Sequence, residues 1–348
     1  MVRHLSGLSA TQLQELAASL GEKPFRGKQL FDHLHQRNAT QLDAIAVLPA
    51  SFRQKLLDDE YEACSLTVSE VQTSIDRTVK LGLETADGHL IETVLIPMDT
   101  GKFTQCISSQ IGCALGCAVC MTGTLGLRRN LTAAEIVDQI RVARRDHPDC
   151  EVRNIVFMGM GEPLNNIPAV VAAVSILQSP RGLSLSPRRI TVSTAGVVPG
   201  IAQLGKEAEV LLAVSLNAPN QAIRERLMPI ARMYPLEELM AALKAWPLPP
   251  RRRLTLEYVL VAGINDQPEH ARELVRLISH IRCKINLIPF NPFPGTSLES
   301  PPDKAIQDFF DILSRKDVVV TIRKSRGQDI QAACGQLAGS RGSKFRDL

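Results

Sequence analysis

The alternation of strand-like and helix-like segments constrains the fold of this chain more than any other feature. From residue 152 onward, short runs rich in Val, Ile and Leu alternate with segments of helical periodicity. Strands that alternate with helices pair in parallel through right-handed crossovers, so an open doubly wound sheet or a full or partial barrel is predicted. The expected strands are 152–158, 189–193, 209–216, 254–261, 283–290 and 318–323. The expected helices include 132–146, 167–178, 235–246, 268–281 and 303–315.

The residues before this alternation have a different character. Residues 8 to about 62 show helical periodicity without strands, and we interpret 1–62 as a small helical domain of the helix-hairpin-helix type. Two β-rich runs then flank Asp87-Gly88, a dipeptide typical of hairpin turns, which predicts a β-hairpin extension over 63–100. A barrel core over 101–325 and a C-terminal loop over 326–348 complete the expected organisation.

Composition narrows the class of protein. A chain of 348 residues with 45% hydrophobic and 22% charged residues is typical of a folded globular protein. Its apolar runs are shorter than the roughly 20 residues that span a bilayer, so we expect a cytoplasmic protein without membrane contact. In that reducing compartment the eight cysteines are expected to stay free. Arginine clusters such as 251–253 fit either a nucleic-acid surface or solvated helix ends.

Four of the cysteines lie within CISSQIGCALGCAVC. Cys113, Cys117 and Cys120 follow a CxxxCxxC spacing, whereas Cys106 stands seven residues upstream. Three thiolates on a short loop suit zinc or an iron–sulfur cluster. Three is one ligand short of the usual four, and no second CxxC follows, which favours a centre with one metal position open to a substrate or cofactor. The remaining cysteines apart from Cys334 fit no spacing and are interpreted as buried or incidental: Cys64, Cys150 and Cys283.

Glycine-rich or polar motifs follow four of the expected strands, at the sheet edge where α/β proteins gather functional residues. These motifs are GMGEP (159–163), STAG (193–196), SLNAP (215–219) and NPFPG (291–295). Within them, Glu162 suits either cofactor contact or the start of a helix, and Asn291 suits either a binding role or a turn.

Together these motifs resemble the radical S-adenosylmethionine (SAM) superfamily and, within it, the RlmN-like family of RNA adenine methyltransferases. The resemblance covers nearly the whole chain, through FRGKQLFDHLHQ (25–36), ETVLIP (92–97), CISSQIGC (106–113), FMGMGEPLNN (157–166), NLIPFNPFPG (286–295) and GQDIQAACGQLAG (327–339). It implies an α/β fold in which a partial (β/α)6 radical SAM barrel carries the small N-terminal helical domain.

The resemblance also implies a cofactor site. Cys113, Cys117 and Cys120 would ligate a [4Fe-4S] cluster, and two SAM molecules would be used in each turnover. The residues implied to surround SAM are Gly161, Glu162, Ser193, Ser215, Leu216, Asn217 and Asn291. Val119 and Leu127 stand where the family usually has aromatic residues, which predicts weaker SAM binding.

In the mechanism that the resemblance implies, one SAM methylates Cys334, which without the resemblance would be interpreted as inert. A 5′-deoxyadenosyl radical from the second SAM removes hydrogen from that methyl group, and the resulting methylene radical adds to the base. Cys106 corresponds to the resolving thiol that forms a transient disulfide with Cys334, and Glu92 to the proton acceptor. Strand alternation places Glu92 on an apolar face with Leu90 and Val94, which fits a perturbed base; a bulged strand with a solvated Glu92 is the alternative.

The implied reaction is methylation of carbon 2 of adenosine 2503 in 23S ribosomal RNA and of adenosine 37 in some transfer RNAs. The implied partners are those RNAs and an electron donor such as flavodoxin, and the implied state is a monomer. Two alternatives stay open: methylation of carbon 8 of the same ribosomal adenosine, and a non-catalytic RNA-binding protein with a structural zinc.

Overall fold

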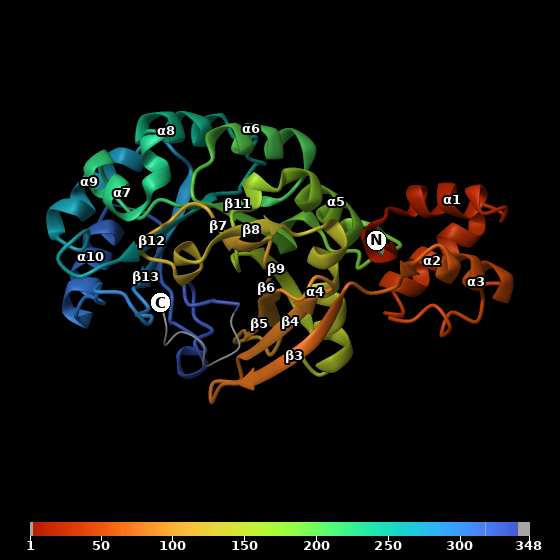
Figure 1. Ribbon diagram of the computed structural model, residues 1–348. Coiled ribbons are helices and arrows are strands. Elements are labelled where there is room, and N and C mark those ends of the chain that lie inside the picture. Colours follow the sequence, from red (N-terminus) through yellow and green to blue (C-terminus); the bar gives the residue numbers. More distant parts are fainter. Residues whose placement is uncertain (1–2, 317, 340–348) are drawn as a thin grey trace.

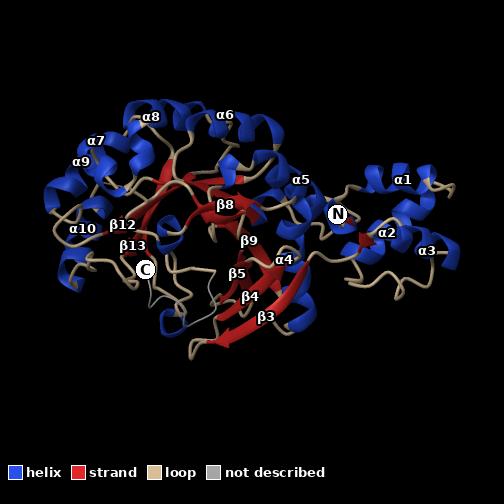
Figure 2. Cartoon of the chain, viewed as in Figure 1, coloured by secondary structure: helices blue, strands red, loops and turns tan. Residues whose placement is uncertain are grey.

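The computed structural model describes residues 3–316 and 318–339, and a ten-stranded sheet forms its centre (Figures 1 and 2). The strands lie in the order β14-β13-β12-β11-β10-β9-β6-β5-β4-β3. They comprise β3 (Leu66–Thr73), β4 (Val79–Thr85), β5 (Leu90–Pro97), β6 (Phe103–Cys106), β9 (Val152–Phe157), β10 (Ile190–Thr194), β11 (Leu211–Ser215), β12 (Leu254–Leu260), β13 (Cys283–Pro289) and β14 (Val320–Ile322). Pairing is antiparallel from β3 to β6 and parallel from β6 to β14.

The parallel part of the sheet forms a partial barrel. Its helices lie along the outer side of the curved sheet (Figure 2). They are α4 (Ala133–Asp146), α5 (Ile167–Gln178), α6 (Val198–Glu207), α7 (Gln221–Leu227), α8 (Leu236–Ala245), α9 (Pro268–Ile278) and α10 (Asp303–Ser314). Six strand–helix units therefore run from β6–α4 to β13–α10, and β14 and β3 are the two edges of the described sheet. The predicted α/β partial barrel is confirmed.

The sequence explains why these strands lie inside. Leu256, Ile285, Leu287, Val192 and Val214 are fully buried on the central strands. Near-continuous apolar runs of this kind suit parallel strands that are covered on both faces. All six predicted strands are present with ends that differ by at most two residues, and Thr132 and Glu135 form the expected capping box of α4.

The antiparallel part contains two strands that the sequence analysis did not predict, β3 and the short strand β6. β4 and β5 form the predicted hairpin, and Gly88 adopts the left-handed conformation in its turn (φ 78°). β3 adds a further edge strand beside β4. Most β3 residues are exposed or half-buried, so the strand lacks the apolar pattern that marks a buried one. None of the described helices has the length and apolar character to cross a membrane.

The N-terminal residues project from the barrel as a small helical unit (Figure 1). It contains α1 (Ala10–Ser19), α2 (Phe25–His35) and α3 (Ala50–Asp58), with the two-residue strands β1 (Arg3–His4) and β2 (Tyr61–Glu62) paired in parallel. A Cβ at Gly27 would lie 2.2 Å from the Leu13 carbonyl oxygen, so glycine permits the close contact of α1 and α2. Arg141 of α4 ties this unit to the barrel by donating to the carbonyl oxygens of Leu34 and Ala39.

Candidate functional site

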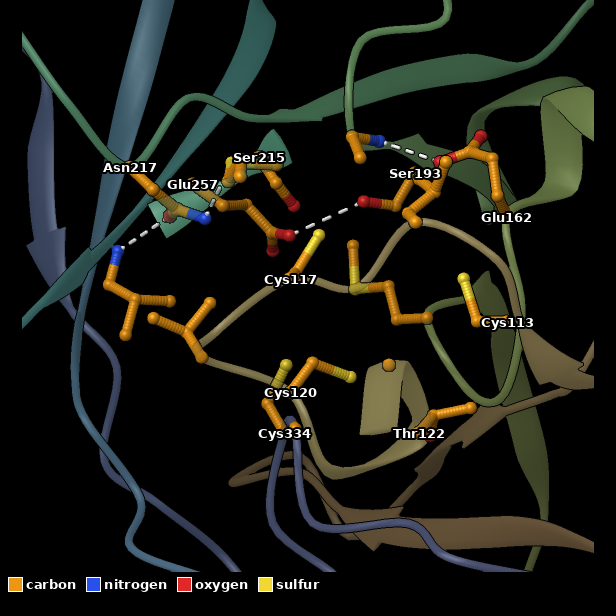
Figure 3. A pocket seen from close by; sticks show the side chains of 18 of the residues that line it. Cys113, Cys117, Cys120, Thr122, Glu162, Ser193, Ser215, Asn217, Glu257 and Cys334 are labelled. Carbon is orange, nitrogen blue, oxygen red and sulfur yellow. Dashed lines mark hydrogen bonds between the residues drawn. The ribbon is translucent and has the colours of Figure 1, made fainter. Parts of the chain in front are cut away.

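The three cysteines of the CxxxCxxC motif line one pocket at the carboxyl ends of β9 to β13 (Figure 3). They lie at the end of β7 (Gln110–Cys113) and on the loop that leads to β8 (Gly126–Asn130). The main chain of this loop is held on two sides, because Ala118 N donates to Leu227 O at 2.9 Å and Met121 N donates to Gly335 O at 2.7 Å. Bonds to α7 and to the C-terminal segment therefore fix the thiols in the pocket wall.

The chemistry of these thiols fits a metal cluster. Burial raises the pKa of Cys113 to about 11. Burial raises the pKa of Cys117 further, and Cys120 and Cys113 add to that rise. Thiols that oppose one another's ionisation become thiolates when a cation compensates their charge. No group of three or more His, Cys, Asp or Glu side chains among the described residues could hold a single metal ion. A [4Fe-4S] cluster takes each thiolate on a different iron, and three thiols in the wall of one pocket fit such a cluster.

The structure places Glu162 at the start of a short 3-10 helix, which is one of the two roles that the sequence left open. Its carboxylate accepts from Leu164 N at 3.0 Å, which caps a short 3-10 helix, and from Ala195 N at 2.8 Å. It also lines the pocket, and burial raises its pKa. Gly161 precedes it with φ 95°, and a Cβ there would lie 2.4 Å from Cβ of Gln110. Only glycine admits this approach of the strand end to β7.

The ends of β10 and β11 contribute Ser193, Ser215 and Asn217 to the same pocket wall (Figure 3). Asn217 adopts the left-handed conformation (φ 56°) and accepts from Val259 N at 2.9 Å. Leu216 differs from its neighbours, because its side chain is fully buried in the core and does not line the pocket. Only its main chain is therefore available to a ligand. Val119 lines the pocket, whereas Leu127 is 41% exposed.

The sequence reading missed Glu257, a buried acid of β12 that lines this pocket. Ser193 Oγ donates to Glu257 Oε2 at 3.4 Å, and Oε1 has no hydrogen-bond partner among the described residues. Burial raises its pKa. The signal that singled out Glu92, an acid inside an apolar strand, is equally present in LTLEYVLV. Glu257 thus offers an unused acceptor to a ligand with hydroxyl or amino groups.

Asn291 holds the C-terminal segment as well as lining the pocket. Its Nδ2 donates to Cys334 O at 3.1 Å, while its Oδ1 accepts from Ser325 Oγ at 2.6 Å and from Gln328 Nε2 at 3.0 Å. Gly335 (φ 85°) would place a Cβ 2.7 Å from Val119 O, so glycine lets the segment lie directly on the cysteine loop. These contacts hold Cys334 in the pocket wall.

Cys334 lies in the pocket wall and near Cys106. It lines the main pocket and also a small neighbouring cavity that contains Arg323. Burial raises the pKa of Cys334 to about 11, and the positive charge of Arg323 opposes that rise. Burial, followed by the neighbouring Cys334, raises the pKa of Cys106 to about 12. The two sulfurs are therefore close enough to influence each other, although 228 positions separate them in the chain. The sequence reading missed Arg323, the cation that they share.

Glu92 is buried as expected, but its surroundings are not purely apolar. Lys80 of β4 lies on the same face, with Nζ 3.1 Å from Glu92 Oε1. Glu92 Oε2 accepts from Ala338 N at 2.7 Å and from Gly339 N at 3.0 Å. The alternation of side chains along β5 could not reveal Lys80, because this lysine belongs to the neighbouring strand β4. Glu92 does not line the main pocket and contacts instead the segment that follows Cys334.

The turn between β3 and β4 clamps the C-terminal segment. Ser74 Oγ donates to Asp329 Oδ1 at 2.6 Å, and Ile75 N donates to Asp329 Oδ2 at 3.3 Å. From the other side, Gly327 N donates to Asp76 Oδ2 at 3.0 Å. The hairpin extension therefore positions the segment 327–339. Residues 340–348, the rest of the expected C-terminal loop, lie outside the described residues.

Asp329→Ala is expected to loosen this clamp, because it removes both acceptors of the Ser74 and Ile75 donors. We expect amide hydrogen exchange in residues 327–339 to be roughly tenfold faster, measured by mass spectrometry on native protein. Asp308→Ala removes an exposed aspartate of an α10 ion pair and serves as the matched control. Equal exchange rates in the two variants would show that the hairpin does not hold the segment.

Comparison with known proteins agrees with this geometry. Residues 107–277 match the radical SAM superfamily, and residues 3–60 match the ribosomal RNA large subunit methyltransferase N-terminal domain. The chain is 48% identical to the dual-specificity RNA methyltransferase RlmN of Geotalea uraniireducens, over 99% of this chain and 98% of that protein. It is 49% identical to the RlmN of Nitratidesulfovibrio vulgaris strain Miyazaki F, over 93% and 91% of the two chains. A crystal structure of a radical SAM methyltransferase from Sphaerobacter thermophilus superposes with a TM-score of 0.93 at 42% identity, covering 97% of this chain and 99% of that one.

Proposed function

The chain belongs to the RlmN family of radical SAM RNA methyltransferases, and from this premise we propose that it methylates carbon 2 of adenosine 2503 in 23S ribosomal RNA and of adenosine 37 in some transfer RNAs. The observation that carries the proposal is the position of Cys334, in the wall of the pocket that the three motif cysteines line. A thiol there can carry a carbon between the cofactor and the RNA base.

Two groups of residues would hold the cofactors. Cys113, Cys117 and Cys120 ligate the [4Fe-4S] cluster. Side chains along the pocket wall, with the main chain of Leu216, surround SAM: Gly161, Glu162, Ser193, Ser215, Asn217 and Asn291. When bound, the cluster supplies one electron to SAM, and SAM supplies both the methyl group and a hydrogen-abstracting radical, with two SAM molecules used per turnover.

Cys334 Sγ is the carrier. As a thiolate it would accept the methyl group of one SAM, whose S–CH3 bond breaks so that S-adenosylhomocysteine leaves. Arg323 favours the thiolate form of Cys334. After one hydrogen has been removed from the carried methyl group, its carbon forms a bond to carbon 2 of the adenine. The base is then tethered to the protein through the sulfur of Cys334. The tethered adduct would return one electron to the cluster, which is left oxidised by the cleavage of SAM, and Glu92 takes the proton from carbon 2.

Cys106 releases the product. Its sulfur attacks the sulfur of Cys334, so that an S–S bond forms while the S–C bond of Cys334 breaks. The electron pair stays with the carbon, which takes up a proton and completes the new methyl group. A thiol reductant must then reduce the disulfide before the next turnover. The influence of Cys334 on the pKa of Cys106, which requires the two side chains to lie near each other, supports this pairing.

The proposal includes its partners. A one-electron donor of the flavodoxin type would reduce the cluster, and the protein would act as a monomer on RNA in the cytoplasm. The Arg251–Arg253 run and similar arginine clusters are available for RNA phosphates.

The experiment that tests the function is product analysis with anaerobically reconstituted protein. We expect iron and sulfide in the purified protein, and 2-methyladenosine in digests of treated 23S RNA and transfer RNA by liquid chromatography and mass spectrometry. Recovery of 8-methyladenosine would contradict the proposed position of methylation. Zinc without sulfide, together with unmodified RNA, would contradict the proposed enzyme.

A further inference from the structure

Arg224 of α7 is a fully buried arginine beside the pocket, and most of its hydrogen-bonding capacity is unused. Its Nη2 donates to Ala195 O at 2.6 Å. Nε and Nη1 are buried and have no partner among the described residues. A guanidinium keeps its charge inside a protein, so a buried one requires acceptors and a compensating anion.

Arg141 shows how this chain satisfies a buried arginine elsewhere. Arg141 is equally buried, but it pairs with the carboxylate of Asp138 and donates to the carbonyl oxygens of Leu34, Ala39 and Ala63. Among the described residues, Arg224 has a single acceptor, the carbonyl oxygen of Ala195, and no carboxylate partner. The contrast indicates that the partner of Arg224 is a group outside the described residues.

The surroundings of Arg224 show where that partner lies. Burial lowers the pKa of Arg224 to about 10, and the neighbouring Cys117 opposes this shift. Leu227, on the same helix, accepts the main-chain bond from Ala118 of the cysteine loop. The helix that carries Arg224 is thus bonded to the loop whose cysteines line the pocket.

The loop after β10 is shaped to admit the guanidinium. Gly196 (φ 105°) would place a Cβ only 2.8 Å from Arg224 Nη2 and 3.2 Å from Leu239. A larger residue at this position would displace the charge, so the chain keeps a space for it behind Ala195, which itself lines the pocket.

We propose that Arg224 is the built-in countercharge of the cluster site, with its free Nε and Nη1 directed to the anion formed by the cluster and its thiolates. The inference rests on the proposed function, which places a [4Fe-4S] cluster on Cys113, Cys117 and Cys120. A cluster with three thiolates is an anion, and reduction adds one more negative charge. A fixed cation in a water-poor site stabilises the reduced form more than the oxidised form and so raises the reduction potential.

The test is a redox titration of the reconstituted protein, followed by electron paramagnetic resonance, with and without SAM. Arg224→Met removes the charge and keeps an apolar side chain of similar length, whereas Arg224→Lys keeps the charge. Arg226→Met, on the exposed side of the same helix, is the matched control. Iron and sulfide content shows whether each variant holds a complete cluster.

For Arg224→Met we expect the ratio of reduced to oxidised cluster at a fixed potential to fall at least about tenfold, a shift of about 59 mV to lower potential. The shift should appear with and without SAM, while Arg224→Lys and Arg226→Met stay close to wild type. If Arg224→Met does not fold, Arg224→Gln replaces it with the same expectation.

Three outcomes would overturn the inference. One is a wild-type potential in an Arg224→Met or Arg224→Gln protein with full iron and sulfide content. A second is a shift of equal size in Arg224→Lys. The third is a shift confined to samples with SAM, accompanied by weaker SAM binding, because the partner would then be the carboxylate of SAM. Absence of a cluster from the wild-type protein would instead contradict the proposed function, so the two failures are distinguishable.

Discussion

Replacing Cys106 with alanine is expected to leave the protein covalently joined to its RNA substrate. In the proposed mechanism the Cys106 sulfur is the group that breaks the bond between Cys334 and the methylated base. Its loss therefore stops the reaction after the base has been tethered. The adduct should persist in denaturing gels, disappear on nuclease treatment, and yield a Cys334 peptide that carries a modified adenosine.

Cys283→Ala is the matched control for this experiment. Cys283 is also a buried thiol with a raised pKa, but it lies at the opposite end of β13 from the pocket. We expect the control to release methylated RNA and to form no adduct. Free methylated RNA from Cys106→Ala at the wild-type rate would contradict the role assigned to Cys106.

Cys334→Ala is expected to abolish RNA methylation while it leaves the cluster in place. Removal of the nucleophile from a covalent mechanism costs several orders of magnitude, so product should fall to below about a thousandth of the wild-type level. The three cluster cysteines are unchanged in this variant, and iron and sulfide contents should therefore match the wild type. The measurements are the amount of methyladenosine per RNA molecule and the iron and sulfide content of the same protein sample.

Cys117→Ala separates the two thiol roles. This variant removes a cluster ligand, so we expect it to lose iron and sulfide together with activity.

Two results for Cys334→Ala would contradict the account. Substantial methylation would show that the methyl group does not pass through the protein. Loss of the cluster would mean that Cys334 contributes to the metal site.

The parallel strands from β9 to β14 could be predicted because burial on both faces leaves an apolar signal within each strand. β3 and the β7–β8 hairpin could not be predicted in this way. β3 is an exposed edge, and β7 and β8 are short strands joined through the cysteine loop. Their pairing depends on contacts between segments and leaves no periodic pattern in the chain.

The candidate site shows the same contrast between features that lie within one segment and features that depend on contacts between distant segments. Cysteine spacing predicted Cys113, Cys117 and Cys120 as ligands, and contiguous motifs pointed to Glu162 and the strand-end residues. Cys106 and Cys334 were expected only from the family resemblance. The ion pair of Glu92 with Lys80, the clamp on Asp329 and the unsatisfied Arg224 all depend on neighbours far away in the chain. Leu216 was expected at the cofactor for its place in the SLN motif, yet its side chain packs into the core. A motif locates a stretch of main chain but does not tell which side chains face the pocket.

The central claim, that the transferred carbon passes through Cys334 as a methylene group, can be tested with SAM whose methyl group is fully deuterated. One deuterium is removed from the methyl group on Cys334 and a solvent proton completes the product. Mass spectrometry should therefore find methyladenosine that retains two of the three deuterium atoms. Product that retains all three would require direct methyl transfer to the base and would contradict the account.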